Sequence, residues 1–135
     1  MAHWLLKSEP STYSWDQLVK DKRTSWTGVR NFQAAINLKA MKAGDRCFFY
    51  HSGEGKDIVG IVEVVKTAYP DPTDKDGKAV TVDIKAVQPV KQPVTLAAIK
   101  ADPRFADMVL VKYSRLSVQP VTEEQWKRIC KMGGL

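Results

Sequence analysis

Apolar residues gather in short runs along the chain, and most runs are rich in β-branched or aromatic side chains, as strands are. The sequence predicts strands over residues 3–7, 46–51, 58–65, 79–85 and 116–118. The Gly-containing segment 52–55 is expected to turn the chain between the second and third of these, which gives a hairpin. A turn-rich segment, 69–77, reads as an exposed loop before the fourth strand.

Helix signals lie before, between and after these strands. Ser14 followed by Gln17 fits a capping box and predicts a short helix to about residue 20, and Thr122 with Gln125 predicts a C-terminal helix that ends at Gly133. Asn31 is expected to cap a further helix. The apolar spacing of that helix continues until a glycine at position 44, and residues 95–100 predict one or two helical turns.

Two segments are expected to be irregular. Residues 22–30 show neither a helical nor a strand period and predict an ordered loop. Pro89 and Pro93 are expected to break regular structure, because proline cannot donate a backbone hydrogen bond.

The order of elements predicts the fold class. Strands do not alternate with helices in βαβ units, and no Gly-rich phosphate loop is present. The pattern indicates an α+β fold, a small curved sheet or barrel of five to six strands with helices at its rim. A chain of 135 residues is enough for one domain, so we expect residues 1–135 to form a single unit.

Composition narrows the class of protein. With 44% hydrophobic and 27% charged residues, the chain is expected to fold rather than to be disordered. No run approaches the roughly 20 apolar residues of a membrane span, and the first residues lack the features of a signal peptide, so we expect no membrane partner. The net charge of +6 permits a polyanionic partner, but the basic residues form no block.

The sequence offers no catalytic or metal-binding motif, and we predict that the chain is not an enzyme. HExxH and GxSxG motifs are absent, and Cys47 and Cys130 are expected to be reduced, buried thiols without metal. His51 and Ser52 are neighbours in sequence, but successive strand residues point to opposite faces. Glu9 could pair with a second carboxylate, although the sequence identifies none.

A segment around Gly28 has the residue types that bind a nucleobase. Trp26 offers an aromatic face, while Arg30 and Asn31 offer hydrogen-bonding groups for a base edge. The alternative is that Trp26 packs in the core and Asn31 only caps a helix. In the same way, residues 50–52 form either a second wall of such a site or a plain strand end.

Five ordered motifs carry a resemblance to a known family. They are WLLKSEP at 4–10, GVRNFQ at 28–33, FFYHS at 48–52, GIVEV at 60–64 and SRLSVQP at 114–120. In order and spacing they resemble the EVE domain family, from about His3 to Ile129. The resemblance implies a PUA-like fold, a bent β-barrel flanked by helices and related to the YTH and ASCH domains. Phe32 and Ala35 depart from it, since many relatives have Tyr and Arg there.

The resemblance also implies a pocket for modified bases in DNA or RNA, with no bound cofactor. Its mouth would be formed by Lys7, Ser8, Glu9 and Pro10, and its lining loop by Trp26, Val29, Arg30 and Asn31. The opposite wall would be Tyr50, His51 and Ser52, and the floor or rim Ser114, Arg115, Leu116 and Ser117. Within this set we expect Trp26 to stack on the base and Asn31 and Ser52 to contact its edge. Lys7, Arg30 and Arg115 would hold phosphate or sugar.

The predicted function is therefore that of a nucleic-acid-binding reader of a modified base, such as a methylated or hydroxymethylated cytosine or a modified RNA base. Two alternatives stay open: an RNA-acting enzyme or accessory subunit of the ASCH kind, and a binding protein for a nucleoside-like small molecule. Components of restriction or RNA-modification systems are candidate partners. The expected location is the cytoplasm in a bacterium or the nucleus in a eukaryote.

Overall fold

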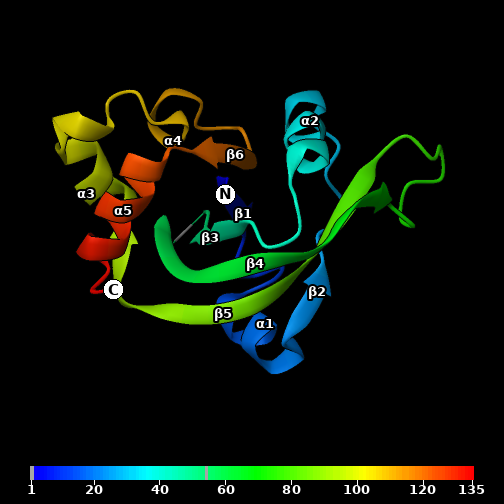
Figure 1. Cartoon of the computed structure of the whole chain (residues 1–135), viewed down its shortest axis with the longest axis horizontal. Coiled ribbons are helices and arrows are strands. Elements are labelled where there is room, and N and C mark those ends of the chain that lie inside the picture. The colour runs from blue at the N-terminus through cyan, green and yellow to red at the C-terminus, as the bar shows by residue number, and fades with distance from the viewer. Residues whose placement is uncertain (1, 54) are drawn as a thin grey trace.

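One mixed sheet organises the chain. The computed structural model describes residues 2–53 and 55–135, and within them six strands lie in the order β2-β5-β4-β3-β1-β6. Strands β1 and β3 are parallel, and the other neighbours are antiparallel. Figure 1 shows the two longest strands, β4 and β5, curving together across the molecule. The bounds are β1 His3–Ser8, β2 Arg23–Ser25, β3 Arg46–His51, β4 Asp57–Pro70, β5 Val80–Thr95 and β6 Val118–Val121.

Helices surround this sheet. Their bounds are α1 Trp15–Asp21, α2 Phe32–Ala40, α3 Leu96–Ala101, α4 Val109–Lys112 and α5 Glu123–Met132, with a 3₁₀ turn η1 at Pro103–Phe105. Helices α3, α4 and α5 gather at one end of the sheet, while α2 lies beside β6 (Figure 1). The α+β prediction is therefore confirmed. In the described part of the chain, no helix combines the length and apolar character that a membrane crossing needs.

The predicted helix caps are present. The side chains of Ser14, Asn31 and Thr122 accept hydrogen bonds from the backbone of α1, α2 and α5. Thr122 and Gln125 form the full reciprocal capping box. Gln17 instead donates its side-chain amide to Asp21 at 3.0 Å, so at α1 the hydrogen bond to Ser14 is the part of the box that forms.

Several predicted boundaries were wrong. Part of the expected loop at 22–30 is strand β2, which pairs with residues 83–85 of β5. Pro89 and Pro93 lie inside β5, where its register against β4 shifts. The pairing of β2 with β5 ends at Lys85, so in the described residues Pro89 and Pro93 lie where β2 no longer flanks β5. Proline, which lacks a backbone N–H, is tolerated at such an edge. Helix α2 ends at Ala40, β4 extends to Pro70, and the last strand lies at 118–121. The hairpin of β3 and β4 is confirmed, while Glu54 in its turn is outside the described residues.

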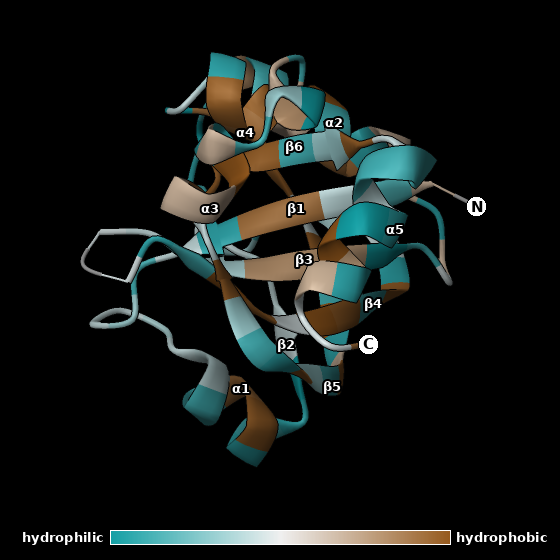
Figure 2. Ribbon diagram, turned by 90° about the vertical axis from the view of Figure 1, so that its left-hand side faces the viewer, coloured by the Kyte–Doolittle hydropathy of each residue, from teal (hydrophilic) through white to brown (hydrophobic). Residues whose placement is uncertain are grey.

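Strand alternation builds a hydrophobic cluster on each face of the sheet. Leu5 and the aligned Phe48 belong to one cluster, and Leu6 and the aligned Phe49 belong to the other, because neighbouring strand residues point to opposite faces. In Figure 2, hydrophobic segments of β1 and β3 run side by side through the centre, beneath α5. The central strands are therefore buried on both faces and fix the position of everything attached to their ends.

The two cysteines differ in burial. Cys47 is fully buried, and burial raises the pKa of its thiol well above the usual range. Cys130 is free but only half-buried, so the prediction of a buried side chain was wrong at that position: it packs at the edge of the cluster around Trp126. Burial also raises the pKa of Cys130.

We expect a thiol reagent to modify Cys130 slowly in the native protein and Cys47 only after unfolding, because the thiolate is the reactive form. Mass spectrometry of the labelled peptides over time would measure both rates. Equal rates at Cys47 and Cys130 under native conditions would contradict the burial of Cys47.

Candidate functional site

A pocket of about 500 Å³ opens where β1 ends and the chain leaves β2. We call it the β1–β2 pocket. It is lined by a subset of the predicted residues: Lys7, Ser8 and Glu9 at the end of β1, Trp26, Val29 and Arg30 after β2, and Ser117 before β6. The fold thus assembles three of the sequence motifs, far apart in the chain, around one cavity.

The buried indole of Trp26 forms part of this wall. Its backbone N–H donates to Val82 at 2.8 Å, which continues the pairing of β2 with β5. Its ring meets Phe49 edge-on at 5.7 Å, and only 8% of the residue is exposed. Most of the side chain therefore serves the core, as the alternative interpretation held, and the remainder faces the pocket. Stacking on a base stays a prediction.

The segment after Trp26 is held by Asp71, which comes from the loop between β4 and β5. Its buried carboxylate accepts from the Gly28 N–H at 2.8 Å, from Arg30 at 3.2 Å and from Thr73. Gly28 has a φ of 84°, which glycine adopts without strain. Burial raises the pKa of Asp71, but the hydrogen bonds from Thr73, Gly28 and Arg30 outweigh it and hold that pKa at about 2. Asp71 is thus a charged anchor for the pocket wall.

Arg30 is consequently less available to a ligand than its sequence position indicates. Its guanidinium bonds to Asp71 and also donates to the Thr73 hydroxyl at 3.1 Å, although the side chain is half exposed. A phosphate would have to share this group with two protein acceptors. The phosphate role of Arg30 stays a prediction.

Lys7 joins the pocket to the 114–117 segment. Its ammonium donates to the backbone carbonyl of Ser114, and its backbone N–H donates to that of Ser117 at 2.9 Å. The ammonium also lies 5.7 Å from the centre of the Tyr50 ring. Burial lowers the pKa of Lys7, so its charge is partly withdrawn from water. Ser114 is therefore tied to Lys7 through its backbone carbonyl but belongs to the lining of neither pocket.

The predicted opposite wall does not line this pocket. Tyr50 is buried in the cluster on the other face of the sheet, and burial raises its pKa. The backbone N–H of Ser52 donates to Ser8 at 2.9 Å, which places Ser52 beside the end of β1 but outside the lining. Pro10 also lies outside it.

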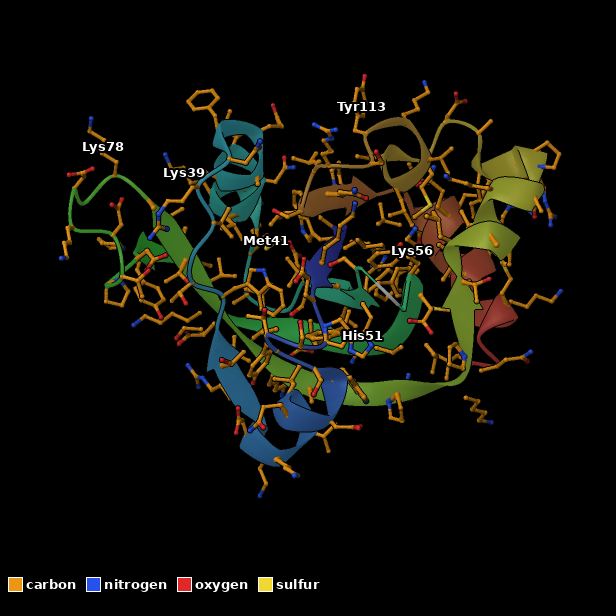
Figure 3. The ribbon with its side chains drawn as sticks, turned by 180° about the vertical axis from the view of Figure 1, so that it is seen from behind. Lys39, Met41, His51, Lys56, Lys78 and Tyr113 are labelled. Atoms are coloured by element: carbon orange, nitrogen blue, oxygen red, sulfur yellow. The ribbon has the colours of Figure 1, made fainter. Side chains whose placement is uncertain are left out.

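The His51 side chain makes a structural contact with α1 rather than lining the β1–β2 pocket. Its Nε2 accepts a hydrogen bond from the backbone N–H of Trp15 at 3.0 Å, at the first turn of α1 (Figure 3). This contact needs the neutral ring with the proton on Nδ1. Burial lowers the pKa of His51, while the carboxylates of Asp57 and Asp16 act in the opposite direction. The side chain therefore fastens α1 to the end of β3.

We expect His51 to make stability depend on pH. Because its folded pKa lies below the usual 6.5, the contribution is complete above about pH 7 and is lost as pH falls towards 5. Losing the Trp15 hydrogen bond would cost about 1 kcal/mol. Denaturant unfolding should show that the free energy of unfolding falls less between pH 7 and pH 5 in His51→Gln than in the wild type. The glutamine amide oxygen can accept the same hydrogen bond but does not titrate. The pKa of His3 is also lowered by burial, and that contribution is common to both proteins. Identical pH profiles would contradict the role of His51.

A second pocket, of about 470 Å³, lies between α2 and α4 and is called the α2–α4 pocket. The predicted residues Asn31, Arg115 and Leu116 line it, together with Gln33, Asn37 and Tyr113. Asn31 accepts from the Ala34 N–H at 2.9 Å, so its capping role is confirmed. The predicted residues that line a cavity are thus divided between two pockets, and Pro10, Tyr50, His51, Ser52 and Ser114 line neither.

Sequence reasoning missed about half of the β1–β2 lining. Five of the missed residues are polar and belong to no motif, namely Thr12, Tyr13, Thr24, Ser25 and Thr27, and the sixth, Gly28, begins the GVRNFQ motif but was not named as a lining residue. Asp71 was missed too, because an aspartate in a turn-rich loop gives no sign of the distant backbone it binds. Within residues 2–53 and 55–135, no group of three or more His, Cys, Asp or Glu side chains could hold a metal ion.

Comparison with known proteins identifies the family. The EVE domain family model matches residues 2–132, and the chain belongs to this family. Thymocyte nuclear protein 1 of Gallus gallus is 38% identical over an alignment of 158 residue positions, and the aligned residues cover 92% of this chain. They cover 65% of the chicken protein, so the chain spans just under two thirds of that relative's length.

Solved structures agree with this assignment. The NMR structure of Rpa0253 from Rhodopseudomonas palustris is 64% identical, with a TM-score of 0.94 over 99% of this chain and 94% of that one. Human THYN1 in complex with 5-methylcytosine-containing DNA is 33% identical, with a TM-score of 0.90 over 100% and 99% of the two chains. An ASCH protein from Zymomonas mobilis, 9% identical with a TM-score of 0.60, shares the fold alone. The predicted PUA-like fold is confirmed.

Proposed function

We propose that this chain is a reader that binds nucleic acid and accepts a modified base, in the first place 5-methylcytosine in DNA, in the β1–β2 pocket. The observation that carries the proposal is the assembly of Lys7–Glu9, Trp26–Arg30 and Ser117 around one cavity. The structure of human THYN1 with 5-methylcytosine-containing DNA supports it, since the two chains align over their full lengths.

The pocket suits a flipped base in size and chemistry. Its volume of about 500 Å³ is in the range of small-molecule sites. The Thr27 hydroxyl and the edge of Trp26 offer polar and aromatic contacts, Lys7 is part of the lining, and the Ser8 hydroxyl, which donates to the Tyr13 carbonyl at 2.6 Å, can still accept a hydrogen bond. Flipping costs a few kcal/mol, which stacking repays in part at roughly 1–3 kcal/mol per base.

We infer binding rather than catalysis from the groups around the pocket. His51 is engaged with the Trp15 backbone, and Lys7 with the Ser114 carbonyl. Glu9 is exposed, and within the described lining no second carboxylate accompanies it. We further propose that residues 1–135 form one EVE domain. Partners from restriction or RNA-modification systems, and a cytoplasmic or nuclear location, stay predictions.

The test fills the pocket without touching the core. Thr27 is exposed and lines the β1–β2 pocket, whereas Thr67 is exposed on β4 and lines neither pocket. Thr27→Trp should lower the affinity for 5-methylcytosine oligonucleotides at least tenfold, and Thr67→Trp should leave it unchanged. Anisotropy titrations would use single- and double-stranded DNA and RNA. In the wild type, burial of one methyl group predicts about fourfold preference over cytosine. Equal binding by wild type and Thr27→Trp would refute the assignment.

Binding should depend only weakly on salt. The +6 net charge is spread over the chain, so about two to four phosphates would be neutralised on binding. The logarithm of the association constant should therefore fall with the logarithm of salt concentration with a slope of about −2 to −4. Titrations over a range of salt concentrations measure it. A slope steeper than about −6 would indicate a far larger footprint.

A further inference from the structure

The two pockets share the chain segments that separate them. Residues 28–30 line the β1–β2 pocket, and Asn31 lines the α2–α4 pocket. Likewise, Ser117 lines the first and Leu116 the second. The two pockets are therefore neighbours, joined by residues that follow one another in the chain.

The α2–α4 pocket combines a free aromatic ring with apolar and amide groups. Tyr113 is 63% exposed, and Figure 3 shows it at the end of α4, pointing away from the molecule. Leu116 and Pro120 add apolar surface, and Gln33 adds an amide, although its Nε2 already donates to Asn37 Oδ1 at 3.3 Å. An exposed ring beside polar amides is a stacking surface for a planar heterocycle.

Arg115 supplies the charge expected between two bases. Of the six arginines, Arg23, Arg30, Arg46, Arg104 and Arg128 each form an ion pair with a carboxylate. Arg115 is exposed, lines the α2–α4 pocket and has no ion pair or side-chain hydrogen bond to any residue in 2–53 and 55–135. An unpaired guanidinium in the lining of the α2–α4 pocket, two residues before Ser117 of the β1–β2 pocket, matches a phosphodiester group.

We propose that the α2–α4 pocket binds the nucleotide next to the modified base, with the flanking base stacked on Tyr113 and the intervening phosphate on Arg115. The inference rests on the proposed function of the β1–β2 pocket. A nucleotide fits better than an apolar peptide, because the pocket pairs an unneutralised cation with an exposed ring and continues into the proposed base site. The site thereby reads two nucleotides rather than one.

The experiment removes the flanking base and the ring separately. Oligonucleotides would carry one 5-methylcytosine with normal flanking bases, or with an abasic position on its 5′ or 3′ side. In the wild type, one abasic position should weaken binding about tenfold. Tyr113→Ala should weaken binding to the normal oligonucleotide to a similar extent. The variant should then bind the abasic oligonucleotide that weakened the wild type with nearly the same affinity as the normal one. Tyr113→Phe keeps the ring and should bind like the wild type.

Arg115 is tested through salt. Arg115→Ala should weaken binding several-fold and reduce the magnitude of the salt slope by about one, whereas Lys100→Ala, an equal charge change on α3, should alter neither. Every variant is checked by thermal unfolding.

The outcomes separate the two proposals. If Thr27→Trp abolishes binding while Tyr113→Ala and the abasic strands leave it unchanged, the flanking site is refuted and the reader function stands. If Tyr113→Ala and the wild type lose equal affinity on both abasic strands, ring and base do not meet, and the flanking site is again refuted. If the wild type binds none of the oligonucleotides, both proposals fail.

Discussion

Gly60→Ala is expected to destabilise the protein by about 3 kcal/mol, a fall in Tm of roughly 10 °C. A Cβ at this position would lie 2.4–2.6 Å from Cη2, Cζ3 and Cζ2 of Trp15, well inside van der Waals contact. The Trp15 indole has little room to move, because it also packs edge-on against Phe49 at 5.5 Å. Relief of the clash would displace α1, which begins at Trp15.

A double-mutant cycle isolates this contact. Trp15→Leu removes the ring atoms that oppose Gly60, so adding Gly60→Ala to it should cost far less than in the wild type. Denaturant unfolding of the four proteins gives the coupling energy. An equal cost of Gly60→Ala in both backgrounds would mean that strand propensity, not the indole, determines the effect.

Asp71→Ala is expected to cost roughly 2–3 kcal/mol of stability and to weaken oligonucleotide binding at least tenfold. The substitution leaves the Gly28 N–H and the Arg30 guanidinium without their shared acceptor, so the wall of the β1–β2 pocket is released. Hydrogen exchange at the Gly28 amide should accelerate. In the wild type the low pKa adds a pH signature: the stabilisation is complete above about pH 4 and is lost as pH falls towards 2.

Asp74 provides the matched control. It accepts backbone hydrogen bonds from Asp76, Lys78 and Ala79 within the same loop, and within residues 2–53 and 55–135 its side chain makes no hydrogen bond or ion pair to the lining of the β1–β2 pocket. Asp74→Ala should loosen the loop and leave both binding and Gly28 exchange unchanged. If the two variants weaken binding equally, the loop as a whole matters and Asp71 is not a specific anchor.

The fold was predictable where local chemistry determines structure. The caps at Asn31 and Thr122 involve residues three positions apart, and the hairpin of β3 and β4 needs only a turn between apolar runs. Strand β2 could not be predicted, since Arg23–Ser25 become a strand only by pairing with β5, some 60 residues later. The prediction that Pro89 and Pro93 break regular structure failed for the same reason, since the cost of a missing backbone N–H depends on the strand that lies beside it.

The site was predictable only as a set of motifs. The motifs shared with the EVE family gave Lys7, Trp26 and Ser117 as members of one pocket, and the fold brings them together. They did not show that Asn31 and Arg115 open into a different cavity, or that Asp71 neutralises Arg30. These are relations across the tertiary structure, and side-chain type carries no signal for them.

The place of β1 in the sheet has a consequence for biosynthesis. This strand is synthesised before the other five strands, yet it lies between β3 and β6 and pairs with Val118–Val121, which follow it by more than a hundred residues. Ser117, which closes the pocket against Lys7, is therefore synthesised more than a hundred residues after the wall it completes. A nascent chain arrested before Ser117 and β6 would expose one edge of β1 and would leave the lining of the β1–β2 pocket incomplete. The lining of the proposed binding site is therefore complete only after the segment that precedes β6 has been synthesised.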